Sequence, residues 1–131
     1  MSSNFSTDNP EVEFYPRTDS YPFSEAVRVG NILYLAGQLG MDASGKLVAG
    51  GVVPETIQTM ENIKDVLERH GSSLDDLIDV TVAIADMAEW PAMNEVYRKY
   101  FTKHFPARNA FGANGLALGA RVEMTCKAVV R

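Results

Sequence analysis

The chain has 131 residues, the size of one domain, and its hydrophobic content of 46% is ordinary for a globular protein. A net charge of −5, without any run of Lys or Arg, argues against a nucleic-acid groove and against binding to an anionic membrane surface. No apolar stretch approaches the roughly 20 residues that span a bilayer, and the N-terminus does not resemble a signal peptide. We therefore expect a cytoplasmic protein without nucleic-acid or membrane partners.

Metal and cofactor motifs are not found in the sequence. The two histidines and the single cysteine, Cys126, show no HxH or CxxC spacing, and Cys126 cannot form an internal disulfide. There is no Gly-x-Gly-x-x-Gly, P-loop or Gly-x-Ser-x-Gly pattern. We expect neither a metal nor a cofactor, which leaves chemistry to the side chains of the chain itself.

The N-terminal part of the chain predicts an arm followed by a hairpin. Residues 1–20 are polar, and we expect an arm that is ordered only against the body, formed by a single domain over residues 21–131. Alternating residues 25–29, the turn signal Gly30-Asn31 and the apolar run 32–38 predict two antiparallel strands.

Gly37 interrupts the second of these strands. A glycine inside a strand indicates a bulge or a close approach of another group to the backbone. It also exposes its amide and carbonyl to a ligand, and the sequence does not decide between these explanations.

Two amphipathic helices are expected. Pro54 fits the first turn of one helix and Gly71 its C-terminal end. A strand over residues 78–85 follows, and Asp86 is expected to cap a second helix that has Trp90-Pro91 in its first turns. Apolar residues at helical spacing form the two inner faces: Ile57, Met60, Ile63, Val66 and Leu67, then Met93, Val96, Tyr97, Tyr100 and Phe101.

The end of the chain carries the candidate chemistry. A loop rich in glycine and small residues is expected after Arg108, followed by a strand whose apolar residues Val122, Met124, Cys126, Ala128 and Val130 share one face. Glu123 lies on the other face, and Arg108 is expected to be aimed at the same space. From spacing alone, a surface ion pair or two solvated charges is the more frequent explanation of such a pair.

These elements predict an α+β fold in which two helices cover one face of a mixed sheet. The other face of the sheet also offers apolar side chains, and no helix is left to cover it. We therefore expect another copy of the chain to bury that face.

Pro106-Ala107-Arg108 and the later segment 119–124, Gly-Ala-Arg-Val-Glu-Met, resemble the C-terminal signature of the Rid family, the reactive intermediate deaminases formerly named YjgF. Residues 29–38 resemble the first hairpin of that family, and the likeness continues in order from about Pro22 to Val130. The resemblance implies a chorismate-mutase-like homotrimer around a central barrel, with clefts between subunits.

The resemblance also implies an activity. Rid enzymes hydrolyse 2-imino or enamine acids to 2-keto acids and ammonia without a cofactor. Carried over to this sequence, Arg108 would hold the substrate carboxylate and Glu123 would orient or activate water. Further substrate contacts are implied for Phe23, Gly37, Asn94 and the backbone amides of Asn109 and Ala110.

Three positions depart from the family pattern. Many members have Tyr where this chain has Phe23, Cys where it has Ala110, and Leu-Pro where it has Leu116-Ala117. The polarity of the pocket has therefore changed, and the preferred imine is left open.

Three other functions also stay open. They are a pathway-specific deaminase for a longer enamine acid of the aminomuconate or aminoacrylate type, a non-catalytic module that binds a small acid, and a ribonuclease. The acidic charge disfavours the last.

Overall fold

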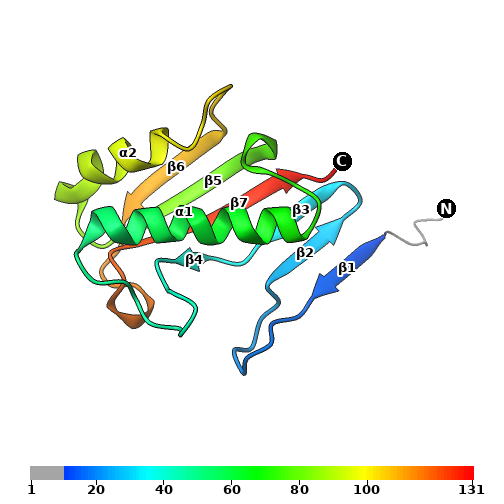
Figure 1. Ribbon diagram of the computed structural model, residues 1–131, viewed down its shortest axis with the longest axis horizontal. Helices are drawn as coiled ribbons and strands as arrows, with labels where there is room; N and C mark the ends of the chain where they lie inside the picture. Colours follow the sequence, from blue (N-terminus) through cyan, green and yellow to red (C-terminus); the bar gives the residue numbers. More distant parts are fainter. Residues whose placement is uncertain (1–10) are drawn as a thin grey trace.

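The computed structural model describes residues 11–131, which form one mixed sheet with both helices on the same face (Figure 1). The strands are β1 (Val12–Tyr15), β2 (Ala26–Val29), β3 (Ile32–Leu35), β4 (Gln38–Leu39), β5 (Leu77–Ile84), β6 (Ala107–Gly112) and β7 (Val122–Val129). The helices are α1 (Val52–Arg69) and α2 (Trp90–Arg98). The strand order is β1-β2-β3-β7-β5-β6, and β4 also pairs with β7. The predicted α+β class with two helices on one face is confirmed.

The sheet begins earlier than the expected hairpin. β1 lies inside the segment expected to be an arm, and it pairs antiparallel with β2, with Val12 opposite Val29. The ring of Tyr15 stacks on His70 at a centroid distance of 4.1 Å, which ties β1 to the end of α1. Residues 1–10, the rest of the expected arm, lie outside the described residues.

The predicted hairpin is confirmed, with Gly30 at φ 60° in its turn. The apolar run that follows is not one continuous strand. It divides into β3 and β4 on either side of Ala36-Gly37, and its register against β7 shifts by one residue between Tyr34↔Lys127 and Gln38↔Met124, as at a β-bulge.

The region after Arg108 was expected to be a loop, and that expectation was wrong. Residues 107–112 form β6, which runs parallel to β5 at the edge of the sheet. Its mixture of small, polar and half-exposed residues has no apolar alternation, so the local sequence gives no strand signal. Pairing with a strand formed some 30 residues earlier defines it instead.

The core lies between the sheet and the two helices. The alternation predicted for β7 is confirmed, since all five residues of its apolar face are buried: Val122, Met124, Cys126, Ala128 and Val130. Gly71 follows α1 at φ 80°, and the Asp86 carboxylate accepts a hydrogen bond from the Ala88 N–H at 2.9 Å just before α2. The expectation that Asp86 caps the second helix itself was wrong, because Asp86 caps the 3₁₀ turn Met87–Glu89 that precedes α2, and α2 begins after Glu89 without a side-chain cap. The end of α1 near Gly71 agrees with the sequence.

The face of the sheet turned away from both helices is called the open face. Register places Val29, Tyr34, Ala83, Phe111 and Glu123 on it. Within the described residues Phe111 is 50% exposed, Tyr34 42% and Val29 39%. This side of the protomer therefore presents apolar surface to its surroundings. As for membranes, neither α1 nor α2 combines the length and apolar character that a bilayer span requires.

A charge network joins the start of β2 to the end of α1. The Arg69 guanidinium donates two hydrogen bonds to the Glu25 carboxylate, at 2.7 and 2.8 Å, and His70 Nε2 lies 2.8 Å from Glu25 Oε2. The hydrogen bonds from Arg69 are the largest cause that holds the pKa of Glu25 below its usual value, and the contact with His70 adds to it. The ionised form of Glu25 is therefore favoured in the folded state.

We predict that Glu25→Gln lowers the free energy of unfolding by about 1 kcal/mol at pH 7, a value reduced for the solvent exposure of Arg69. Because the folded pKa of Glu25 is the lower one, its contribution is complete above the unfolded carboxylate pKa of about 4.3. It disappears as pH falls through the folded pKa. Urea denaturation at pH 7 and at pH 3 measures both effects.

Glu95→Gln is the matched control, because Glu95 contacts Arg98 only at 3.6 Å between two largely exposed side chains. It should change stability little at either pH. An effect of Glu25→Gln that is equally large at pH 3 would contradict the assignment to charge.

Candidate active site

Arg108 lies on β6, opposite Val80 of β5, and its side chain therefore points to the helix side of the sheet. Its Nη1 donates a hydrogen bond of 2.7 Å to Asn94 Oδ1 on α2. The guanidinium carbon lies 5.1 Å from the ring of Trp90 and 4.8 Å from that of Tyr97. Among residues 11–131 no carboxylate pairs with Arg108. Its charge is available to an anion.

A pocket of about 220 Å³ opens at Arg108, and it will be called the arginine pocket. It is lined by Asn94, Tyr97, Arg98, Phe105, Pro106 and Arg108. Burial raises the pKa of Tyr97 to about 12, so this phenol stays neutral and does not compete as an anion for the guanidinium. A planar cation held on aromatic rings, with free N–H groups, suits a carboxylate ligand.

Glu123 lies on β7 opposite Ala83, on the open face. Its carboxylate is packed on the backbone of Gly37. A Cβ atom added at Gly37 would overlap Glu123 Oε2 and would lie 3.2 Å from Glu123 Cδ. Close approach to the backbone is thus the reason for glycine here. Among the described residues Glu123 has no ion-pair partner.

A second pocket, of about 530 Å³, opens at Glu123 and will be called the glutamate pocket. It is lined by Phe23, Ser24, Ala26, Val27, Tyr34, Leu35, Ala36, Gly37 and Glu123. Glu123 is the sole carboxylate in this lining, and most of the other side chains are apolar. A carboxylate in such surroundings can accept a proton from a bound water.

The expectation that Arg108 and Glu123 share one space is wrong within the protomer. They line different pockets on opposite faces of the sheet. Arg108 lies opposite Val80 of β5 and Glu123 opposite Ala83, and residues 80 and 83 of one strand point to opposite faces. The other expected site residues divide between the two pockets. Asn94 accompanies Arg108, whereas Phe23 and Gly37 accompany Glu123.

Asn109 and Ala110 belong to β6 next to Arg108. Asn109 is exposed on the open face, and Ala110 packs against the core on the helix side. Neither residue lines the arginine or the glutamate pocket.

Trp90 and Tyr97 were not expected in the site, because Tyr97 was assigned to the inner face of α2. A signal for them did exist. Asn94 lies four residues after Trp90 and three before Tyr97, so the three share one side of the helix. A polar residue on an otherwise apolar helical stripe indicates a polar partner, which the structure identifies as Arg108.

No cluster of three or more His, Cys, Asp or Glu within residues 11–131 is arranged to hold a metal ion.

Comparison with known proteins gives the family. The chain is 45% identical over 109 residues to a 2-iminobutanoate/2-iminopropanoate deaminase of the goat, Capra hircus, and 38% identical to the human protein of that name. Both alignments cover 82% of this chain and 80% of the relative. A family model described as endoribonuclease L-PSP, which covers the Rid proteins, matches residues 17–130. The chain belongs to the Rid family.

Solved structures agree with the Rid assignment. A Rid-family protein from Yersinia pestis superposes with a TM-score of 0.87 at 28% identity, covering 92% of this chain and 100% of that chain. The resemblance of residues 22–130 to Rid proteins is thus confirmed over nearly the whole described chain.

We predict that Arg108→Ala weakens the binding of a small 2-keto acid such as pyruvate by at least about tenfold. The reason is the loss of charge-assisted hydrogen bonds, each of which contributes about 1.5–3 kcal/mol. Isothermal titration calorimetry measures the change in Kd.

Arg98→Ala is the matched control in this experiment. Arg98 borders the same pocket, but its side chain is 58% exposed and lies near Glu95. Equal losses in the two variants would show that general positive charge, and not the Arg108 geometry, attracts the ligand.

Proposed function

We propose that the protein hydrolyses reactive 2-imino and enamine acids to 2-keto acids and ammonia, without a cofactor. The observation that carries this proposal is the presence, in a Rid-family chain, of a guanidinium in one pocket and a carboxylate in another, neither of which has an ion-pair partner within residues 11–131. The first group fits the carboxylate of a 2-imino acid, and the second fits proton transfer between the water that attacks the imine carbon and the departing nitrogen. Relatives named as imine deaminases support the same chemistry.

We further propose that the working site forms between two copies of the chain in a homotrimer. The arginine pocket of one copy and the glutamate pocket of its neighbour would together enclose the substrate. Two features support this arrangement: Arg108 and Glu123 lie on opposite faces of one sheet, and the open face carries half-exposed Tyr34 and Phe111. A sheet face of this kind is suited to burial against another copy around a central barrel.

The chemistry requires little from the protein, because such imines also hydrolyse in water. Arg108 would hold the substrate carboxylate through its free N–H groups, while Asn94 and the rings of Trp90 and Tyr97 keep the guanidinium in place. Glu123 would take a proton from a water that attacks the imine carbon and return it to the departing nitrogen. Positioning and proton transfer of this kind contribute on the order of a few kcal/mol each.

Water is the only co-reactant that the hydrolysis needs. One water adds across the C=N bond, and the tetrahedral intermediate then loses ammonia to leave the 2-keto acid. An enamine acid first takes a proton on carbon to become the imine. No electron transfer occurs, which agrees with a site built from Arg108 and Glu123.

We propose that the protein carries out this hydrolysis in the cytoplasm.

The decisive assay generates 2-imino acids with an amino-acid oxidase and follows their trapping by semicarbazide. The protein should lower semicarbazone formation. We predict that Glu123→Gln reduces this effect by about 10²–10⁴-fold, the range typical of a lost acid–base group. Binding of pyruvate with no change in imine lifetime would instead favour the non-catalytic binding module.

Gly37→Ala tests the support of Glu123. Because the added Cβ overlaps the Glu123 carboxylate, we predict a large loss of activity in a variant that still folds. Gly45→Ala is the control for the general effect of replacing a glycine on folding. A Cβ at Gly45 meets nothing within 4 Å, and the cost of this change comes from its φ of 82° alone. Unchanged activity in Gly37→Ala would contradict the role of this contact.

The shared site predicts complementation. Arg108→Ala and Glu123→Gln proteins should each be inactive, but subunits mixed at equal amounts should recover about a quarter of wild-type activity, because that fraction of interfaces combines two intact halves. Differently tagged chains, co-expressed and purified as mixed oligomers, allow the measurement. Mixed oligomers without any recovered activity would exclude a site shared between copies.

A further inference from the structure

The segment between β1 and β2, residues 16–25, contains no helix or strand but carries Phe23. It is organised around Arg17. The Arg17 guanidinium donates hydrogen bonds to both carboxylate oxygens of Asp19, at 2.8 and 2.6 Å, and the N–H of Tyr21 also donates to Asp19, at 3.1 Å. Only 19% of the Arg17 side chain is exposed, a low value for a charged residue on a loop.

The same guanidinium packs on two aromatic rings. Its carbon lies 4.8 Å from the ring centroid of Phe23 and 5.2 Å from that of Tyr21. The two rings are nearly parallel, at 25°, with centroids 5.9 Å apart. Each aromatic residue is 49% exposed in the single protomer, so little else within the protomer fixes its position. The orientation of Phe23 therefore depends on Arg17.

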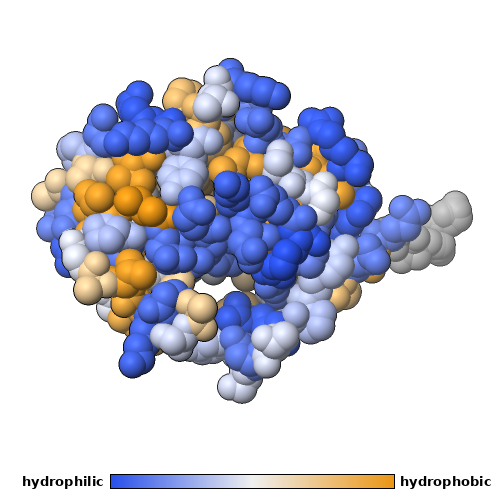
Figure 2. Space-filling view, viewed as in Figure 1, coloured by the Kyte–Doolittle hydropathy of each residue, from blue (hydrophilic) through white to orange (hydrophobic). Residues whose placement is uncertain are grey.

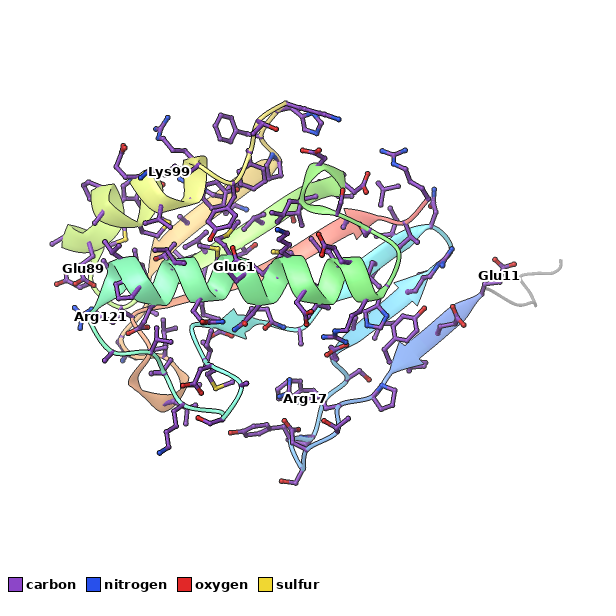
Figure 3. All side chains as sticks on the ribbon, in the orientation of Figure 1. Glu11, Arg17, Glu61, Glu89, Lys99 and Arg121 are labelled. Atoms are coloured by element: carbon purple, nitrogen blue, oxygen red, sulfur yellow. The ribbon has the colours of Figure 1, made fainter. Side chains whose placement is uncertain are left out.

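Arg17 and Phe23 face different spaces. Phe23 lines the glutamate pocket, whereas Arg17 lines a polar cavity of about 390 Å³ between this loop and α1. Figure 2 shows the molecule hollowed between α1 and the loop, and Figure 3 shows the Arg17 side chain at this hollow. The guanidinium thus supports the Phe23 ring from the side away from the glutamate pocket.

The wall that Phe23 completes is apolar. Apart from Glu123 and the hydroxyl groups of Ser24 and Tyr34, the glutamate pocket is bordered by hydrocarbon and by the backbone of Gly37. No cation lines this pocket within the described residues. A substrate side chain that enters it is best matched by an apolar group, because a second carboxylate would find no partner and would face Glu123.

We propose that Arg17 is a positioning residue that holds Phe23 in the wall of the glutamate pocket, and that this wall favours 2-imino acids with bulky apolar side chains. The proposal rests on the deaminase function proposed above. Arg17 acts through Phe23 and does not contact the reacting atoms. Its removal should therefore change substrate preference more than the chemical step.

The experiment compares imines made in situ from leucine and from alanine, which differ in the size of an apolar side chain. Arg17→Ala should lower kcat/KM for the leucine-derived imine about tenfold, mainly through KM, because the cation–π contacts and the ion pair are both lost. The kcat/KM for the alanine-derived imine should change less than about twofold, because its methyl group buries the least surface against Phe23. Thermal denaturation establishes that the variant is folded.

Two matched variants identify the cause. Arg17→Lys keeps the charge but lacks the planar fork that bridges Asp19 and stacks on both rings, so it should behave like Arg17→Ala. Arg131→Ala removes an ion pair to Asp76 in which the Arg131 side chain is 74% exposed, and this residue lines neither pocket, so substrate preference should stay as in wild type. An equal loss for both imines, no loss for either, or full rescue by Arg17→Lys would overturn the proposal.

A binding measurement separates this inference from the proposed function. Wild type should bind 4-methyl-2-oxopentanoate, the keto acid of leucine, more tightly than pyruvate, and Arg17→Ala should remove most of that difference. If wild type hydrolyses no imine, the proposed function fails, and these Kd values still decide the role of Arg17. Equal preference in wild type and Arg17→Ala would overturn it.

Discussion

The alternation of side chains along neighbouring strands is the constraint on which the site depends. β6 pairs with β5 so that Arg108 shares the helix side with Val80, whereas β7 pairs with β5 so that Glu123 shares the open face with Ala83. One sheet therefore separates the two charged groups of a single protomer. A reaction that uses both would need a second copy of the chain, and in the shared site proposed above the open face would have a chemical as well as a packing role.

Each half of the site is held by a different kind of contact. In the arginine pocket, Arg108 donates a hydrogen bond to the amide oxygen of Asn94 and packs on the aromatic rings of α2. The glutamate half depends on the absence of a side chain at Gly37, which lets the Glu123 carboxylate lie on the backbone. Neither group is neutralised by a described partner. Both are fixed in position while their charges remain available, as a site for a small anionic substrate requires.

Figure 3 shows a further ionic contact, in which Arg121 at the start of β7 meets Glu89 just before α2. The backbone N–H of Arg121 also donates to the carboxylate of Glu55, which is 5% exposed on α1. These bonds fasten both helices to the strand that carries Glu123, two residues from the site. Arg121 is thereby engaged in structure, although it belongs to the same sequence signature as Glu123.

The sequence by itself determined the parts of this protein that depend on local pattern. The hairpin at Gly30, the two helices, the buried face of β7 and the outward direction of Glu123 all follow from periodicity and turn chemistry, and motif resemblance gave the family. Tertiary structure alone decided three other features. Strand β6 has no apolar alternation and exists through its parallel pairing with β5. That pairing sets the side to which Arg108 points. The support of Phe23 by Arg17, six residues earlier, depends on how an irregular loop folds back, and irregular segments have no period from which such contacts can be predicted.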